Sequence, residues 1–271
     1  MSRATGRPAV LRPLHAEWTK LRTLHSTWWL LAATAVLTVA VGAAAAASVG
    51  AGVCASAAGC REDTVKLSLT GVWTGQATAL VLGALSMGAE YGTGTIRTTL
   101  AAVPHRAVLL ASKAAVLAGA TTAAGAVAVA ASLAVGRLIL PGDVFTQESG
   151  YPLPSPTDGP TLRAATGSVL CLALVALLGL GLAALFRDSA GGITAGLALL
   201  YVVPLLAGLL GDPDWKERLE RWAPMPAGLA VRSTTDLSRL PIGPWPGLGV
   251  LAAYTLGILL VATAAFRTRD A

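Results

Sequence analysis

The most informative stretch of the sequence is residues 90–106, EYGTGTIRTTLAAVPHR, which lies between two apolar segments. A carboxylate such as Glu90 at the end of an apolar run is costly unless it lies at a membrane surface or is paired. Gly92 and Gly94 follow it closely, and glycines interrupt helices. We therefore expect a helix to end near Glu90 and a flexible joint to follow it.

The residues after this joint have the pattern of a short amphipathic helix. Ile96, Leu100 and Val103 recur at helical spacing, and Pro104 then removes a backbone donor and stops the helix. Such a helix lies along a membrane surface and gives a membrane protein a contact point for something in the cytoplasm.

The partner of Glu90 is not decided by the pattern. Arg97 is seven residues away and shares a face with Glu90 if the helix is continuous, but Gly92 and Gly94 interrupt it. Glu90 is otherwise a surface anchor or the partner of a neighbouring basic group. The alternative for the whole segment is a loop that sets topology and contacts nothing.

Motifs for bond chemistry are absent. None of the four lysines follows a glycine, which excludes the usual Walker A loop, and neither HExxH nor GxSxG occurs. No predicted span carries a charge near its middle, which disfavours a proton- or ion-coupled transporter. No His or Cys cluster has metal-ligand spacing. We therefore expect no catalytic residues, no metal and no cofactor in this chain.

The composition is that of a membrane protein. The 271 residues are 54% hydrophobic and 13% charged, whereas soluble domains are about 25% charged. The mean hydropathy is +0.66. The net charge of +6 is not a nucleic-acid signature, because no basic tract with interleaved aromatics accompanies it.

Six apolar stretches are near the roughly 20 residues that cross the hydrocarbon of a bilayer. The expected fold is therefore all-α, a single transmembrane domain over residues 1–271. The predicted spans are residues 28–49, 72–89, 108–133, 164–185, 191–210 and 247–266.

Charge predicts the orientation. If the N-terminus is cytoplasmic, the inner side carries eleven basic and four acidic residues, and the outer side carries nine basic and ten acidic residues. This distribution fits the positive-inside rule, so both termini are expected to be cytoplasmic.

Residues 11–25 predict an amphipathic helix on the inner membrane surface. Leu14, Trp18 and Leu21 share one face of this helix. The alternative is an ordinary basic flank that only sets topology. On the outer side, residues 215–222 predict a short helix with Trp215 and Trp222 on one face. Cys54 and Cys60 lie in the first outer loop, where a disulfide and two unpaired thiols are both reasonable.

The chain resembles permease subunits of type-2 ABC exporters, especially the Ala-rich actinobacterial ones. The resemblance rests on LHAEWTKLRTLHSTWW near the start, on GAEYGTGTIRTTLAAVPHR followed by LLASK, on the six-span plan, and on the ending FRTRDA. It implies that residues 91–104, next to Glu90, form a coupling helix that docks on a separate ATPase subunit. The residues assigned to coupling by this resemblance are Glu90, Tyr91, Gly92, Gly94, Thr95, Ile96, Arg97, Leu100 and Pro104.

The resemblance further implies partners and a location. The partners are an ABC ATPase subunit that binds ATP and a second permease copy or a paralogue, within the lipid of a bacterial cytoplasmic membrane. The alternatives are a membrane protein that transports nothing, such as a sensor or an assembly factor, and a secondary transporter.

Overall fold

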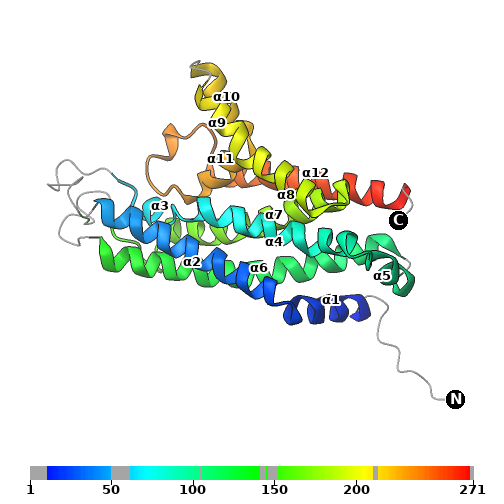
Figure 1. Cartoon of the computed structure of the whole chain (residues 1–271). Helices are drawn as coiled ribbons and strands as arrows, with labels where there is room; N and C mark the ends of the chain where they lie inside the picture. The colour runs from blue at the N-terminus through cyan, green and yellow to red at the C-terminus, as the bar shows by residue number, and fades with distance from the viewer. Residues whose placement is uncertain are drawn as a thin grey trace.

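The computed structural model describes residues 11–49, 62–103, 105–140, 145, 152–209 and 213–268. These residues form an all-helical fold without strands (Figure 1). The helices are α1 (Leu11–Thr23), α2 (His25–Ser48), α3 (Thr64–Ser68), α4 (Val72–Gly92), α5 (Ile96–Ala102), α6 (Arg106–Ile139), α7 (Gly159–Phe186), α8 (Ser189–Leu197), the π-helical η2 (Ala198–Val202), α9 (Val203–Leu209), α10 (Pro213–Trp222), α11 (Pro224–Leu229), the 3₁₀-helical η3 (Ala230–Arg232) and η4 (Leu237–Arg239), and α12 (Pro244–Thr268). Cys54, Cys60 and Pro104 lie outside the described residues.

Five helical stretches are long and apolar enough to cross a membrane, which makes this a multi-pass membrane protein. They are His25–Ser48, Arg106–Ile139, Gly159–Phe186, Ser189–Leu206 and Pro244–Phe266. The remaining predicted span, residues 72–89, is also helical and lies within α4. The 21 residues of α4 include Gln76 and Glu90, and α4 is not among the five.

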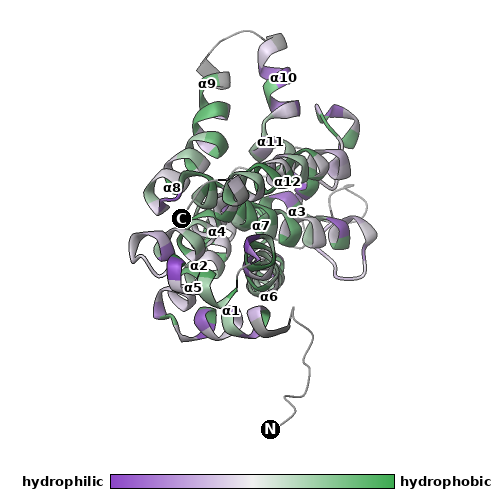
Figure 2. Cartoon of the chain, turned by 90° about the vertical axis from the view of Figure 1, so that its right-hand side faces the viewer, coloured by the Kyte–Doolittle hydropathy of each residue, from purple (hydrophilic) through white to green (hydrophobic). Residues whose placement is uncertain are grey.

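The central helix of the bundle is α7. Its most apolar window is 67% buried within the protein, against 28% or less for the other four stretches. It packs against α4, α6, α8 and α12, and in the view along the bundle these helices surround it (Figure 2). The outer helices present apolar side chains outward, as expected for surfaces that face lipid.

Helix α4 packs so closely against α7 that the backbones of the two helices are in contact. A Cβ atom added to Gly83 of α4 would lie 1.8 Å from the carbonyl oxygen of Ala176 on α7, and one added to Gly179 of α7 would lie 2.2 Å from the carbonyl oxygen of Leu80. Small residues allow such an approach between helices in membranes. This contact fixes α4, and therefore Glu90 at its end, relative to the rest of the bundle.

Gly83→Ala is accordingly expected to destabilise the protein, because the helix backbones must move apart to admit the methyl group. We expect a loss of about 1–3 kcal/mol. The matched control is Gly119→Ala on α6, where an added Cβ meets nothing within 4 Å. That change should be neutral or stabilising by up to about 1 kcal/mol through helix propensity. Thermal unfolding in detergent measures both, and equal effects at the two positions would contradict the packing described.

The fifth predicted span is interrupted at its middle. Its π-helical segment η2 ends at Val202, just before Pro204. Proline lacks a backbone donor and its ring clashes with the preceding turn, so a local widening of the helix is a common accommodation. Beyond this point α9 leads to α10, and the two stand away from the other helices (Figure 1). Helix α10 confirms the helix predicted at residues 215–222.

Four exposed tryptophans lie near the starts of long helices. They are Trp28 and Trp29 of α2, Trp73 of α4 and Trp245 of α12. Tryptophan is enriched at membrane–water interfaces, where its apolar ring and polar N–H both find suitable surroundings.

Helix α1, helix α5 and the C-terminal end of α12 lie at the same end of the bundle (Figure 1). At the opposite end, Asp63 before α3 caps that helix by accepting from the backbone N–H of Lys66. The same carboxylate accepts from the backbone and the hydroxyl of Thr234 and from the backbone of Thr235. The segment after η3 is thereby fastened to the start of α3.

Candidate functional site

Four charged side chains from three helices meet at the end of the bundle that holds α1 and α5. Lys113 Nζ on α6 donates to Glu17 Oε2 on α1 at 2.7 Å and to Glu90 Oε1 on α4 at 2.6 Å. Lys20 Nζ on α1 donates to the same oxygen of Glu90 at 2.9 Å and to Glu17 Oε1 at 3.0 Å. We call these two carboxylates and two ammonium groups the charge cluster.

Burial makes the members of the charge cluster depend on one another. The side chains of Lys113, Glu17 and Glu90 are 4%, 7% and 11% exposed, whereas that of Lys20 is 43% exposed. A buried ion that loses its partner costs about 3–5 kcal/mol, whereas an exposed pair contributes about 1 kcal/mol or less. Lys113 is therefore the member on which the arrangement depends most.

The charge cluster favours the ionised forms of Glu90 and Lys20. Burial alone disfavours an ionised Glu90, but the charge of Lys113 and hydrogen bonds from Lys113 and Lys20 outweigh it, so the pKa of Glu90 lies below 4.5. Burial likewise disfavours an ionised Lys20, but hydrogen bonds to Glu90 and Glu17 outweigh it and raise the pKa of Lys20 above 10.5. Such groups are poor proton donors or acceptors near neutral pH, and they suit a structural clamp better than acid–base catalysis.

The pKa shifts predict how stability depends on pH. A lowered carboxyl pKa gives stability that is present above the unfolded value of 4.5 and is lost as pH falls through the folded value. A raised lysine pKa gives stability that is present below 10.5 and is lost as pH rises through the folded value. The stability that these two pKa shifts contribute should therefore be constant from about pH 5 to about pH 10.

Thermal unfolding of the wild type and of Glu90→Gln between pH 3.5 and pH 10 tests this expectation. The difference in stability between the two proteins should be largest on the plateau and should shrink below about pH 4.5. A difference that grew as pH fell would contradict the assignment of a lowered pKa to Glu90.

A groove of about 720 Å³ runs alongside the charge cluster, between α1 and α2 on one side and α4 and α5 on the other. At the cluster end hydroxyl groups line it, including those of Thr95, Thr98 and Thr99. Towards the middle of the bundle its walls become apolar, with Leu30 and Leu82. The groove separates the N-terminal helices from the joint except where the charge cluster bridges them.

The joint between α4 and α5 turns at a glycine. Helix α4 ends at Gly92, and Gly94 then adopts a φ of +70°, a left-handed conformation that favours glycine. An added Cβ would meet nothing within 4 Å at either glycine, so the backbone conformation and not crowding requires Gly94. Thr95 precedes α5, and its carbonyl accepts the hydroxyls of Thr98 and Thr99. The predicted break in the helix is confirmed here.

Helix α5 places its apolar residues inward and Arg97 outward. Ile96 is buried, and Leu100 and Val103 pack partly buried against the main core, as their spacing indicated. Tyr91, before the joint, packs against the same core. Arg97 is exposed and is not a partner of Glu90, whose ion pairs among the described residues are with Lys20 and Lys113. Of the possibilities for Glu90, pairing with a neighbouring basic group is therefore the one observed.

Helix α1 is the helix that the sequence predicted at residues 11–25, but it turns a charged residue towards the bundle. Leu14 and Leu21 are partly buried, and Trp18 is 48% exposed. The fully buried positions of this helix include Glu17, which reaches Lys113 on α6. The predicted apolar face of Leu14, Trp18 and Leu21 therefore lies beside the surface of α1 that contacts the bundle, and Glu17 is part of that contact.

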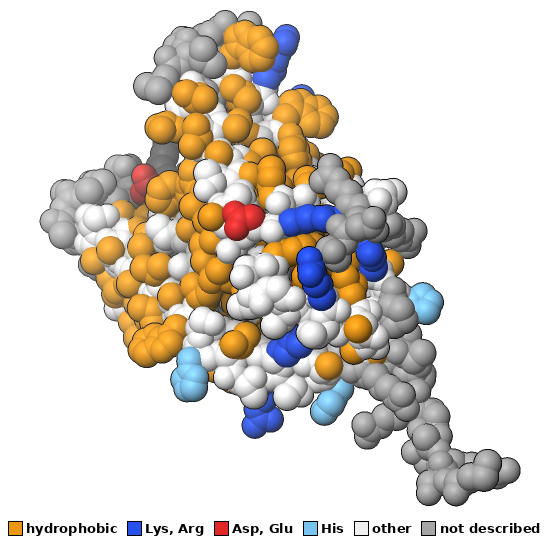
Figure 3. Space-filling view, turned by 45° about the vertical axis from the view of Figure 1, so that its right-hand side comes forward, with side chains coloured by type: hydrophobic (Ala, Val, Ile, Leu, Met, Phe, Trp, Pro, Cys, Tyr) orange, Lys and Arg blue, Asp and Glu red, His pale blue; other side chains and the backbone are white. Residues whose placement is uncertain are grey.

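The start of α6 is also tied to the end of α12. Arg106 Nη1 donates to the backbone oxygen of Phe266 at 2.7 Å, and its guanidinium lies 5.7 Å from the centre of the Phe266 ring. Basic side chains gather at this end of the molecule (Figure 3). Four helices, α1, α4, α6 and α12, are thus joined by charged groups beside α5.

Sequence reasoning missed Glu17, Lys20 and Lys113 as members of one site. Lys113 lies within the predicted third span and Glu90 just beyond the second, and both are costly there without a partner. Two opposite charges at similar depth in consecutive spans were the available signal. Comparison with protein-family models found no match, and comparison with curated proteins found none either.

Proposed function

We propose that this chain is the membrane-spanning subunit of an ATP-driven exporter of the type-2 ABC class. In this proposal residues 72–89 of α4 cross the membrane in addition to the five stretches described above, which gives six spans. Both termini lie on the cytoplasmic side, and the bundle forms half of a translocation pathway. A separate ATPase subunit docks on α5 and supplies the energy. A second copy of the chain or a paralogue completes the pathway.

The observation that carries the proposal is the charge cluster next to an exposed docking helix. Helix α5 is held to the core by Ile96 and Leu100 and presents Arg97 outward. The helix before it, α4, is clamped to α1 and α6 through Glu90. A displacement of α5 is therefore expected to move α4, α1 and α6 together, which is what a coupling element requires.

The mechanism follows from this rigidity. ATP shifts the ATPase between two arrangements, and a partner can shift this chain only as far as it binds one of its states more tightly. Helix α6 has 34 residues and is about 50 Å long, so a displacement at Lys113 reaches the opposite end of the bundle. This chain itself forms and breaks no bonds.

Charge and shape support the remaining parts of the proposal. The end with α1 and α5 carries the exposed Arg22 and Arg97, as the positive-inside rule expects of a cytoplasmic surface. The span α8–α9 leans away from the bundle and exposes Val202, Leu205 and Leu206. This apolar face suits contact with a second permease copy.

Purification in mild detergent tests the proposal. An ATPase with Walker motifs should co-purify with the protein, and ATP depletion in cells should stop the transport that the pair performs. If repeated purifications recover no ATPase and ATP depletion leaves the activity intact, a sensor, an assembly factor or a secondary transporter is favoured instead.

A further inference from the structure

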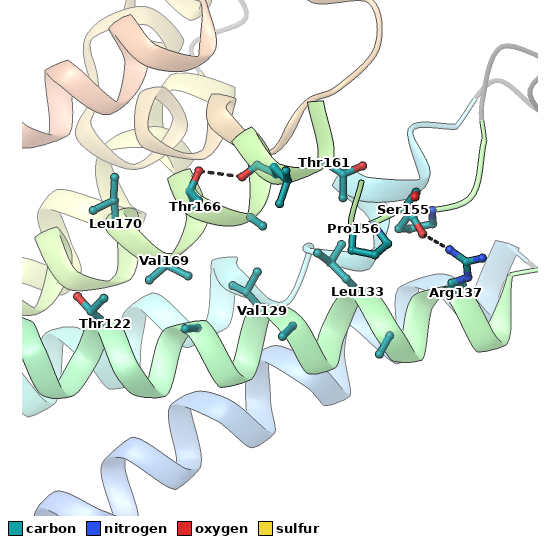
Figure 4. A pocket seen from close by; sticks show the side chains of 16 residues that line it. Thr122, Val129, Leu133, Arg137, Ser155, Pro156, Thr161, Thr166, Val169 and Leu170 are labelled. Carbon is teal, nitrogen blue, oxygen red and sulfur yellow. Dashed lines mark hydrogen bonds between the residues drawn. The ribbon is translucent and has the colours of Figure 1, made fainter. Parts of the chain in front are cut away.

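A second cavity lies between α6 and α7, in the half of the bundle opposite the charge cluster. It is an open cleft of about 840 Å³, within the range typical of ligand sites. On α6 it is lined by Ala126, Ala130 and Ala134, which recur every fourth residue and so share one face. Leu162 and Val169 of α7 form the opposite wall (Figure 4). The short alanine side chains explain why the helix faces leave a hollow.

The walls of the cleft offer almost no free polar group. The hydroxyl of Thr166, at the cleft, donates to the carbonyl oxygen of Leu162 within its own helix (Figure 4). Among the described residues, those that line the cleft include no carboxylate, and Arg137 is their one charged side chain. The interior therefore suits a hydrocarbon.

Arg137 lies at one end of the cleft and is exposed. Its Nη1 donates to the carbonyl oxygen of Pro154 at 3.1 Å, which positions the guanidinium at the rim, and no carboxylate among the described lining residues compensates its charge. A planar guanidinium with further donors suits a phosphate oxygen.

The length of the cleft matches one leaflet of a membrane. Along α6 it extends from Arg137 to Thr122, which is 15 residues and about 22 Å of helix. One leaflet has about 15 Å of hydrocarbon plus its headgroup region. Arg137 lies in the last turn of α6 and Thr122 lies at the middle of that helix. The charged rim therefore lies towards the end of the bundle and the apolar part towards its middle, which is the order of headgroup and chain in a leaflet.

We propose that this cleft binds one acyl chain of an anionic membrane phospholipid, with the phosphate of the lipid at Arg137. The alanine face of α6 and the larger side chains of α7 enclose the chain. This inference depends only on the protein spanning a membrane and is independent of the ATPase proposal.

Native mass spectrometry of the delipidated, full-length protein tests the lipid site. The probes are phosphatidylglycerol and phosphatidylcholine with identical acyl chains. The wild type should bind phosphatidylglycerol about fivefold more tightly, the value expected for one Arg near an anionic headgroup. Arg137→Gln should remove this preference, and because Arg137 is exposed the variant is expected to fold.

A pair of tryptophan variants tests the cleft itself. Ala130→Trp places a large side chain in the hollow and should lower binding of both lipids. Ala123→Trp, at an exposed position of α6 outside the cleft lining, is the matched control and should leave both unchanged. Equal binding of the two lipids by the wild type, or wild-type binding by Ala130→Trp, would overturn the proposal. If Ala130→Trp instead converted a dimer to a monomer with lipid binding unchanged, a second copy would be the occupant and the proposal would fail.

Discussion

Lys113→Met is expected to lower the free energy of unfolding by about 3–5 kcal/mol, the cost of removing one partner from a buried ion pair. Lys113 is the buried cation between Glu17 and Glu90, and without it both carboxylates depend on Lys20 alone. Thermal or denaturant unfolding in detergent micelles measures the loss. The variant should also weaken any coupling between α5 and the bundle, because α6 is no longer tied to α1 and α4.

Two controls separate burial from mere loss of charge. Lys20→Met removes the same charge from a side chain that is 43% exposed and should cost about 1 kcal/mol or less. Combining Lys113→Met with Glu17→Gln leaves Glu90 paired with Lys20 and should recover part of the loss. Equal costs for the two single lysine variants, or a double variant less stable than the sum of its parts, would contradict the arrangement described.

If α5 docks on an ATPase as proposed, Arg97→Glu is expected to abolish transport while the protein remains folded and inserted. Arg97 is exposed on α5 and takes no part in the charge cluster, so its reversal changes the surface and leaves the core intact. Reversing a charge at a docking surface opposes the partner's field, and we expect ATPase association to weaken at least about tenfold. Co-purification yield and transport rate measure the two effects.

Lys216→Glu is the matched control, because it makes the same charge change on the exposed α10. It should leave ATPase association and transport near wild type. Normal transport by well-inserted Arg97→Glu would falsify the proposed coupling role of α5.

Five of the six predicted spans correspond to helices that are long and apolar enough to cross a membrane, and they were predictable because a helix that faces lipid must be apolar over most of its length. The predicted and observed bounds differ by no more than three residues at either end for α2, α4 and α12. Helix α4 nevertheless is not among the five stretches that are long and apolar enough to cross a membrane, and it packs tightly on α7 through Gly83 and Gly179. It faces protein more than lipid, and it contains the fully buried Gln76. The mean hydropathy of such a helix is therefore a weaker indicator of whether it crosses the membrane.

The inward face of α5 and the break at Gly94 were also readable, since both depend on residues close in sequence. The charge cluster was not readable, because Glu17 and Lys113 are 96 residues apart and meet only when α1 lies on α6. Helical periodicity within α1 indicated an apolar face with Trp18, but it does not determine which neighbouring strip contacts the bundle. Pairing across helices depends on tertiary packing.

The proposed contact between α5 and an ATPase is tested most directly by site-specific photo-crosslinking in cells. A photoreactive amino acid at the exposed Thr98 of α5 is compared with one at Leu205 on the apolar face of α9. We predict that Thr98 captures a polypeptide that mass spectrometry identifies as carrying Walker motifs, and that Leu205 does not. Absence of such a product at Thr98 in a protein that is inserted and expressed at the wild-type level would contradict the proposed docking of an ATPase on α5.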